Sequence, residues 1–307
     1  HGHSTTFGAF FKDGYEGAIK SWWRKILRQT TSPADILDIG CGNAALLIEL
    51  LEQQIHGTYT GVDLAGVRLN EVAKQKLKQS TGLSALLKPY TNAEELPLKS
   101  ESIDLAASVF GIEYSDLRKS LPEAIRVLRP NGVFHALVHA DESVISTMSA
   151  RALSEFQDAD MGSIVDNLRV IDQQLNELRV PARLKQSRPS EAARINLNGL
   201  AQKYMSNLNP DTGNAIMVQF VGDALKYFKM LNQSDTIRAQ YIDGIEAEFQ
   251  ASRQRYTAMA AAAQSETDIA SIRTLLQQQN CAAMSVEKFF ADEEQRELGG
   301  WHISVRK

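Results

Sequence analysis

Cysteine is scarce in this sequence, and neither sign of charge is in large excess. The 307 residues include two cysteines, Cys41 and Cys281, too few for a disulfide framework or a thiolate zinc site. The 33 basic residues are outnumbered by 37 acidic ones, so the net charge is −4. Broad nucleic-acid surfaces need clustered excess Lys and Arg. We therefore expect no nucleic-acid partner and no metal site.

Long apolar runs are also missing. None approaches the roughly 18 residues that a membrane-spanning helix needs, and no signal-peptide pattern opens the chain. We therefore expect a cytoplasmic protein that does not contact a membrane. Its length suits one large domain or two ordinary ones.

The most informative stretch is residues 35–51, where a short apolar run meets a pair of glycines. Residues 36–39 predict a buried strand, and leucines at helical spacing predict a helix over residues 44–54. Between them, Gly40 and Gly42 permit a sharp turn and a close approach of a ligand to the backbone. In open α/β sheets this arrangement forms a ligand site at the carboxyl end of a strand.

The glycine spacing alone leaves two classes of ligand open. Gly40, Gly42 and Ala45 also satisfy the dinucleotide fingerprint, which would suit a nicotinamide-dependent oxidoreductase. Asp38 argues against that class, because its carboxylate would repel a pyrophosphate. A cationic or zwitterionic ligand meets no such repulsion.

Residues 37–42, Leu-Asp-Ile-Gly-Cys-Gly, resemble the first motif of class I S-adenosylmethionine (SAM)-dependent methyltransferases. SAM carries a sulfonium and an ammonium group but no phosphate. Ala44 stands where that family usually has a third glycine. The resemblance implies a doubly wound, Rossmann-like α/β sheet of seven strands. It also implies that four residues of the turn contact SAM: Asp38, Gly40, Cys41 and Gly42.

Asp63 ends a second predicted strand, over residues 57–63. Nucleoside-binding folds carry an acidic residue here that accepts hydrogen bonds from ribose hydroxyls. The alternative is that Asp63 caps a helix, which we predict from Ala65 to about Ser80. In the methyltransferase interpretation, Asp63 and Leu64 both contact the cofactor.

Two further strands, over residues 83–87 and 102–109, are each followed by polar residues. Residues 91–97 resemble the family's segment that meets the adenine edge, with an asparagine where aspartate is more usual. The alternative is a polar loop with a helical turn. The carboxyl end of the 102–109 strand should also face the ligand. The cofactor contacts implied here are Asn92, Ala93, Glu94, Ser108 and Phe110.

The residues after the fourth strand limit which class of methyl acceptor we expect. Methyltransferases that act on nucleic-acid amino groups carry an Asn/Asp-Pro-Pro-aromatic motif there, which residues 109–114 lack. A helix is predicted over residues 121–132, entered at Pro122, and a fifth strand over 133–139. Residues 127–133 are close to the family's third motif. The acceptor is therefore expected to be a small molecule.

Methyl transfer from a sulfonium mainly needs alignment of donor and acceptor and exclusion of water. A general base is needed only for a hydroxyl, an acidic carbon or a protonated amine. His139, at the end of the fifth strand, is the first candidate, because an imidazole titrates near neutral pH. Glu113 and Tyr114 are alternatives, and a purely structural role for His139 stays open.

Aromatic residues dominate residues 7–28, which we predict to form one or two helices. They could simply cover the first strand. In the resembled family a helix here often closes over the cofactor, so Tyr15 and Trp22 could also contact it. We treat residues 1–31 as an N-terminal helical cap and 32–140 as the SAM-binding core.

From residue 141 to 280 strand patterns give way to apolar residues every three or four positions, which predicts a helical bundle. Residues 283–290 and 301–305 alternate like strands and should close the sheet in segment 281–307. The bundle is then an insertion between the fifth and sixth strands, placed as a lid or substrate pocket. Its basic run, residues 179–194, could bind an anionic acceptor or form a solvated loop.

The sequence thus predicts a SAM-dependent methyltransferase that acts on a small molecule and releases S-adenosylhomocysteine. Two alternatives remain, a nicotinamide-dependent oxidoreductase and a non-catalytic SAM-binding partner protein. The oligomeric state is open, a homodimer included.

Overall fold

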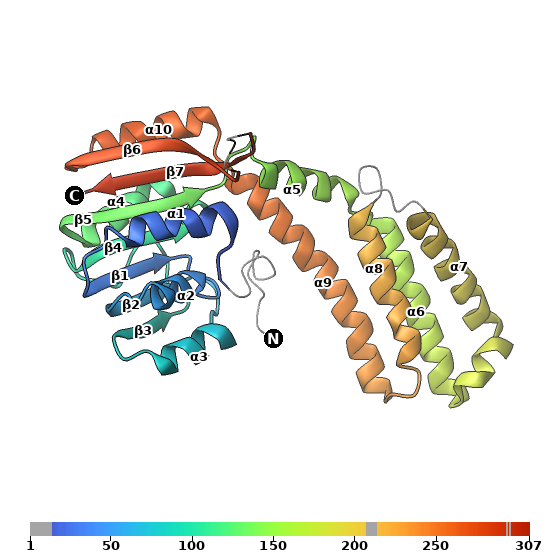
Figure 1. Cartoon of the computed structure of the whole chain (residues 1–307). Coiled ribbons are helices and arrows are strands. Elements are labelled where there is room, and N and C mark those ends of the chain that lie inside the picture. Colours follow the sequence, from blue (N-terminus) through green and yellow to red (C-terminus); the bar gives the residue numbers. More distant parts are fainter. Residues whose placement is uncertain (1–13, 207–213, 293, 295) are drawn as a thin grey trace. The chain divides into compact units, whose positions relative to one another are not determined.

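The computed structural model describes residues 14–206, 214–292, 294 and 296–307. The chain divides into two compact units. The α/β unit comprises the residues up to Thr147 together with Met259–Lys307, and the helical unit is Met148–Ala258. Figure 1 labels the helices and strands of both units. The first part of the predicted N-terminal helical region, residues 7–13, lies outside the described residues.

Seven strands form the single sheet of the α/β unit, in the order β3-β2-β1-β4-β5-β7-β6. Strands β1 to β5 pair in parallel, and β7 runs antiparallel to both of its neighbours. This confirms the predicted seven-stranded, Rossmann-like sheet with a helical insertion between the fifth and sixth strands. The strands are β1 (Ala34–Ile39), β2 (Gly57–Val62), β3 (Leu83–Lys88), β4 (Ile103–Val109), β5 (Leu128–Val138), β6 (Ala283–Phe290) and β7 (Leu298–Arg306).

Both faces of the sheet are buried. Because successive side chains of a strand point to opposite faces, neighbouring residues of one strand belong to different apolar clusters. On β1, Ile36 belongs to one apolar cluster and Leu37 to the other. The first cluster includes residues of α1 (Gly17–Leu27), α2 (Ala45–Glu52) and α3 (Glu71–Gln79). The second includes residues of α4 (Leu117–Val127) and α10 (Glu266–Gln277). Figure 1 shows helices on both sides of the strands.

Two helices begin elsewhere than predicted. α3 starts at Glu71, not at Ala65, because the Asn70 side chain caps it by accepting the Ala73 N–H at 2.7 Å. α4 starts at Leu117, capped by Asp116, so Pro122 lies inside the helix rather than at its entrance. It ends at Val127, and the following residues, including Pro130, already belong to β5.

The helical unit has its own apolar core, formed by residues of four long helices. These are α6 (Asp158–Leu178), α7 (Arg188–Met205), α8 (Ala215–Lys226) and α9 (Asp235–Ala262), with short 3₁₀ turns η2 (Pro181–Gln186) and η3 (Tyr227–Lys229). The chain passes between the units within α5 (Val144–Glu155) and within α9.

The helical unit, Met148–Ala258, contains fewer residues than the predicted segment 141–280. α10 falls outside it, because this helix packs against α4 and β6 of the α/β unit. No helix in the described part of the chain has both the length and the hydropathy needed to cross a lipid bilayer.

Candidate functional site

The turn after β1 brings three strand ends together. Gly40 has φ +69°, and a Cβ there would lie 2.7 Å from the Cα of Gly111, which follows β4. Only glycine fits so close a contact between two backbones. The N–H groups of Gly40 and Cys41 both donate to the Val62 carbonyl at the end of β2, at 2.9 and 3.1 Å. The turn is therefore fixed against both neighbouring strands.

Ala44 is held in the left-handed conformation, with φ +62°, and is fully buried. An alanine disfavours this conformation by about 1 kcal/mol because its Cβ approaches the backbone. Backbone conformation therefore explains why the resembled family usually has glycine at this position, which the sequence pattern alone did not show.

Asp63 holds the turn through its carboxylate. Oδ2 accepts the Gly42 N–H at 2.9 Å, and Oδ1 accepts the Ala65 N–H at 2.8 Å. Asp63 is not the cap of α3, because that helix begins at Glu71. Each carboxylate oxygen can still accept a second hydrogen bond.

Asp38 lies beneath the turn and is almost fully buried. Its Oδ2 accepts a hydrogen bond from the Tyr59 hydroxyl at 2.8 Å. Burial raises the pKa of Asp38 to about 7, and the nearby Asp63 charge adds to the rise. Tyr15 is buried close enough for Asp38 to help raise its pKa, after the larger effect of burial. Tyr15 therefore lies near Asp38, and the contact of both residues with a cofactor stays a prediction.

The predicted adenine segment lies beside Asp63, because the Thr91 N–H donates to the Asp63 carbonyl at 2.9 Å. Asn92 is exposed, and its Oδ1 accepts the Glu94 N–H at 3.0 Å. The Glu94 carboxylate instead accepts from the Asp116 N–H and from Lys119, at 3.0 and 3.2 Å. Glu94 therefore fastens this segment to the start of α4.

Two large apolar side chains project into solvent next to these groups. Leu64 is 73% exposed and Tyr90 is 78% exposed. Leu64 was predicted to contact a cofactor, but Tyr90 was not. A Cβ at Gly66 would lie 2.7 Å from the Tyr90 hydroxyl, so the ring lies against this loop. Such side chains suit stacking on a flat aromatic ligand.

The Ser108 side chain is fully buried and contributes no exposed surface. Its hydroxyl donates to the Ile39 carbonyl at 2.7 Å and accepts the Ile112 N–H at 2.9 Å. It therefore joins the end of β1 to the turn after β4. Because the whole residue is buried, the predicted contact of Ser108 with a ligand stays a prediction, and its role in the structure is to hold the two turns together.

The three predicted catalytic residues lie together after β4 and β5. The Tyr114 hydroxyl is 3.4 Å from His139 Nε2, and Glu113 Oε1 accepts the His139 N–H at 3.0 Å. The Phe110 ring stacks on the His139 ring, with centroids 4.5 Å apart. Glu113 and His139 are buried, whereas Tyr114 is 42% exposed. Of the three, Tyr114 is the one that a ligand can reach.

Burial keeps the two inner groups uncharged near pH 7. It lowers the pKa of His139 to about 4 and raises the pKa of Glu113 to about 8. Burial also raises the pKa of Tyr114 well above its usual value. A neutral imidazole with so low a pKa is a weak base. The cluster is therefore better suited to orienting a ligand through Tyr114 than to removing a proton from a weak acid.

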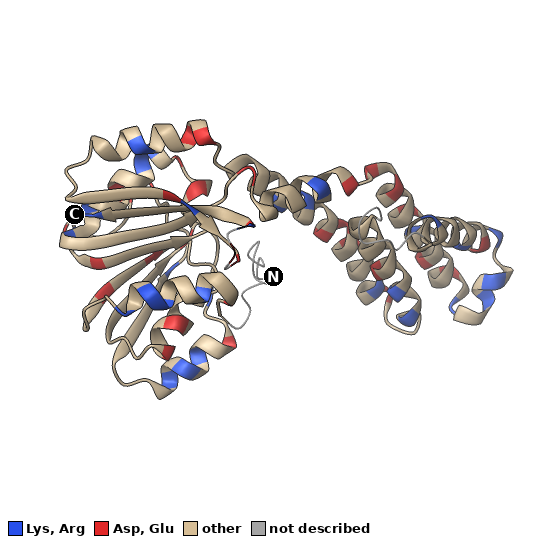
Figure 2. Cartoon of the chain, turned by 45° about the horizontal axis from the view of Figure 1, so that its top comes forward, with Lys and Arg blue, Asp and Glu red and all other residues tan. Residues whose placement is uncertain are grey.

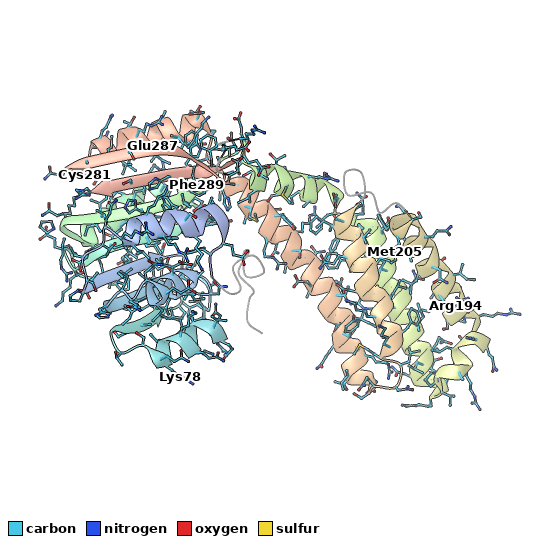
Figure 3. All side chains as sticks on the ribbon, viewed as in Figure 1. Lys78, Arg194, Met205, Cys281, Glu287 and Phe289 are labelled. Atoms are coloured by element: carbon cyan, nitrogen blue, oxygen red, sulfur yellow. The ribbon has the colours of Figure 1, made fainter. Side chains whose placement is uncertain are left out.

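Trp22 lies on the face of the sheet, away from the turn. Its ring centroid is 5.1 Å from that of His302, 6.3 Å from His135 and 6.0 Å from Phe289, which Figure 3 labels. Its neighbour Trp23 is buried in the cluster that contains Ile36. This arrangement agrees with the interpretation in which aromatic residues of this region cover the sheet.

Residues 37–136 match a family model described as a methyltransferase domain. The matched segment runs from β1 to β5 and contains the glycine turn and Asp63. Over this segment the chain is similar to methyltransferase domains. The sheet order of the α/β unit agrees with the fold predicted from this resemblance.

Curated relatives resemble this methyltransferase domain over part of their length. A ubiquinone/menaquinone biosynthesis C-methyltransferase of Rickettsia bellii is 31% identical over 127 residues, which is 39% of this chain and 51% of the relative. A malonyl-[acyl-carrier protein] O-methyltransferase of Geobacter sulfurreducens is 30% identical over 139 residues, covering 44% and 51%. The chain thus spans about half the length of the curated relatives it matches.

Solved structures are similar at lower identity. A putative SAM-dependent methyltransferase of Methanococcus maripaludis is 12% identical, with a TM-score of 0.43, over 94% of this chain and 84% of that one. A possible histamine N-methyltransferase of Thermotoga maritima is 23% identical, with a TM-score of 0.32, over 47% and 61%.

Sequence reasoning missed several residues that shape the site of the methyltransferase domain. Tyr59 binds Asp38, and nothing in its sequence context indicates this. Gly111 faces Gly40, and a glycine directly after a predicted strand could have indicated the close contact. Gln264 donates its N–H to the His139 carbonyl at 2.7 Å, and Trp301 Nε1 donates to the Gln264 carbonyl at 3.2 Å.

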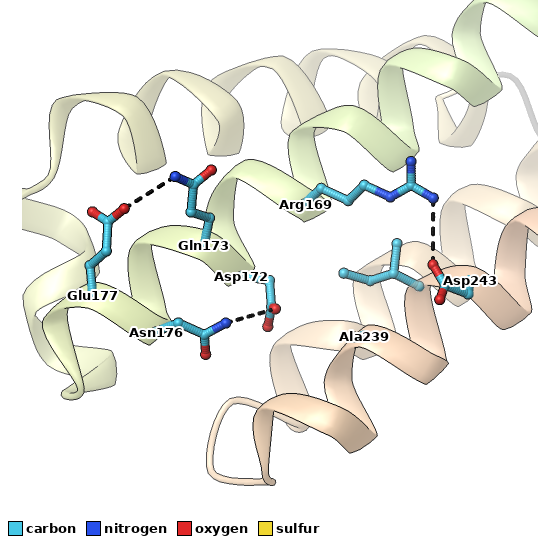
Figure 4. A pocket seen from close by; sticks show the side chains of 8 residues that line it. Arg169, Asp172, Gln173, Asn176, Glu177, Ala239 and Asp243 are labelled. Carbon is cyan, nitrogen blue, oxygen red and sulfur yellow. Dashed lines mark hydrogen bonds and ion pairs between the residues drawn. The ribbon is translucent and has the colours of Figure 1, made fainter.

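A cavity of about 450 Å³ lies in the helical unit, between α6 and α9 (Figure 4). Its polar side chains bind one another: Arg169 contacts Asp243 at 3.4 Å, and Gln173 donates to Glu177 at 3.1 Å. Asp172 accepts from the buried Arg238 and from Tyr227. Because these groups already have partners, the cavity does not displace the strand ends as the candidate site. Within the described residues, no cluster of three or more His, Cys, Asp or Glu could hold a metal ion.

Proposed function

We propose that this protein transfers a methyl group from SAM to a small-molecule acceptor at the carboxyl ends of β1, β2, β4 and β5. One observation carries the proposal: the Gly42 N–H donates to the Asp63 carboxylate. In dinucleotide-binding folds, backbone N–H groups at this turn bind the pyrophosphate. A carboxylate on that N–H, with Asp38 buried below, disfavours a diphosphate and suits a cationic nucleoside.

The residues of the turn fit the two ends of SAM. Asp63 has acceptor capacity left for the ribose hydroxyls. Leu64 and Tyr90 offer apolar surface to the adenine, and Asn92 with Ala93 offers amide and backbone groups to its edge. The backbone of Gly40, Cys41 and Gly42 accommodates the methionine portion, with Asp38 and Tyr15 beneath. Phe110 lies toward the acceptor side.

Bound SAM supplies an already activated methyl group. The chain's own task is then to align the acceptor and exclude water, which can lower a barrier by several kcal/mol. Tyr114 is the exposed group of the cluster, and we assign it to orienting the acceptor by a hydrogen bond. His139 fixes the direction of that hydroxyl, and Glu113 fixes the backbone of His139.

The helical unit is proposed to take part in acceptor recognition. Both of its connections run beside His139: Ala140 pairs with Gln264, and the Asp141 N–H donates to the Gln264 carbonyl at 3.2 Å. An acceptor-dependent change in the helical unit would therefore reach His139 and Tyr114 through the backbone.

The proposal is tested by incubating the protein with SAM carrying a labelled methyl group and a metabolite extract. We expect label in a low-molecular-weight product, and we expect Tyr114→Phe to lower turnover without weakening SAM binding, because the ring remains and only the hydroxyl is lost. Thr58→Ser, a conservative change in the first half of β2, serves as the control. SAM binding without any labelled product would instead support a non-catalytic protein.

A further inference from the structure

The helical unit distributes its positive charge unevenly. It contains thirteen Lys and Arg residues. Eight of them form ion pairs with described acidic residues: Arg151, Arg169, Arg194, Lys203, Lys226, Arg238, Arg253 and Arg255. Most basic side chains of the unit are thus neutralised by partners within it.

Four of the other five lie between the end of α6 and the first residue of α7, Arg188. We define the basic connection as Arg179, Arg183, Lys185 and Arg188. All four side chains are exposed, and none forms a hydrogen bond or ion pair with a residue in the described part of the chain. Figure 2 colours Lys and Arg blue, and blue positions lie along this connection in the helical unit.

The placement of these charges opposes the local electrostatics of α7. Arg188 is the first residue of this 18-residue helix, and the other three members of the basic connection precede it. A helix N-terminus is positive and favours acidic residues. Arg194, which binds the Glu191 carboxylate, is the main cause of the lowered pKa of Glu191. The nearby positive charge of Lys185 lowers this pKa further, by a smaller effect. Figure 3 labels Arg194, whose side chain extends away from the helices.

Natural proteins tend to break such local rules at functional positions. We propose that the basic connection is a docking surface for an acidic protein segment. This inference goes beyond the proposed methyl transfer and does not depend on it.

The chemistry of the surface favours a protein partner over the other polyanions. Three of the four residues are arginines, whose planar fork binds carboxylates in a bidentate manner. Arginine is enriched and lysine depleted in protein–protein interfaces. Single-stranded nucleic acids need exposed aromatic side chains for stacking, and membrane-surface helices need an apolar face with Trp, Phe or Leu. Residues 179–188 contain no aromatic residue, and Val180 is their exposed large apolar side chain.

The test uses the full chain and a synthetic helical peptide of roughly 20 residues with glutamates in every turn. At low ionic strength we expect the parent to bind this peptide despite its net charge of −4. The double variant Arg183→Glu/Lys185→Glu should bind it at least about tenfold more weakly, since the surface then repels the peptide. Fluorescence anisotropy of the labelled peptide measures the affinity.

The matched control is Lys78→Glu/Lys99→Glu, which changes the net charge equally at exposed positions of the α/β unit. It should bind the peptide within about twofold of the parent, since its charges lie elsewhere. Circular dichroism checks that both variants are folded. Equal weakening by the two double variants would overturn the proposal. So would binding of a thymidine oligonucleotide or of phosphatidylglycerol vesicles to the basic connection when the peptide does not bind.

Discussion

Asp63 is the residue on which most of the candidate site depends. It bonds the glycine turn and the loop after β2, and it retains acceptor capacity for ribose hydroxyls. We predict that Asp63→Ala weakens SAM binding by about 2 kcal/mol, or roughly thirtyfold, since hydroxyls lose a charged acceptor. Calorimetric titration measures this. An affinity equal to that of the parent would remove Asp63 from the cofactor site.

Glu113 makes a separate prediction about pH. Its folded-state pKa is about 8, above the ordinary value of 4.5. The folded state therefore holds this proton more tightly, and stability falls as the pH rises from about 4.5 through 8. Glu113→Gln removes this titration while keeping an oxygen for the His139 N–H. At about pH 9 the variant should exceed the parent by on the order of 2 kcal/mol in unfolding free energy, with little difference at about pH 5.

Denaturant unfolding at the two pH values provides this measurement. Asp38 shifts in the same direction, with a pKa of about 7, but it is present in both proteins and cancels in the comparison. A stability difference between variant and parent that is identical at both pH values would show that Glu113 is ionised in the folded protein.

Residues at strand ends could be predicted from the sequence, because parallel strands present their carboxyl ends at one edge of the sheet. Tyr114 and His139 meet for this reason, although 25 residues separate them. Residues placed by tertiary contacts could not be predicted in the same way. Trp22 lies on His302, and Glu94 binds Lys119, because of packing that no local pattern encodes.

At the scale of elements, the turn between β1 and α2 makes the strictest demand. We predict that Gly40→Ala destabilises the fold by at least about 2 kcal/mol and abolishes SAM binding. The added Cβ would lie 2.7 Å from Gly111 Cα. The alanine would also have to adopt a φ of +69°, which L residues rarely do. Thermal unfolding and SAM titration measure both effects.

Gly162→Ala is the control for that substitution. Gly162 lies on α6, and a Cβ there would contact nothing within 4 Å. Alanine in a helix should stabilise the chain by about 0.5–1 kcal/mol. If both glycine substitutions had the same effect on stability, close packing at the turn would not explain the requirement for Gly40.

The bounds of β1 to β4 and of β6 were predicted closely, because their apolar runs are bounded by glycine or polar residues. β5 and β7 are longer than predicted, beginning at Leu128 and Leu298. Helix starts were predicted less well. The Ala65 N–H donates to Asp63, and Ala65 belongs to an irregular loop. α3 therefore begins only after its cap, Asn70. At α4, the cap Asp116 was overlooked, because Pro122 was assigned to the helix entrance.

At the scale of the whole molecule, the chain has separate apolar cores in its two units. We predict two thermal unfolding transitions. SAM at about one hundred times its dissociation constant should stabilise the transition of the α/β unit by about 2.7 kcal/mol and leave the other unchanged. Scanning calorimetry measures both. A single transition that shifts as a whole would show that the units unfold together.

The insertion was visible in the sequence, because strand patterns stop after β5 and return at β6. Its boundaries were not, since α10 has the same helical pattern as the helices before it. α10 belongs to the sheet's core because its buried side chains, Ile269, Ile272 and Leu276, pack against residues distant in sequence.

The central claim is that the glycine turn, with Asp38 below and Asp63 on its N–H group, selects a cationic nucleoside over a diphosphate. Calorimetric titration of the full chain with SAM and, separately, with NADH tests it most directly. The account predicts saturable SAM binding with a dissociation constant on the order of 10 μM or tighter and no heat with NADH. Saturable binding of NADH without binding of SAM would contradict it.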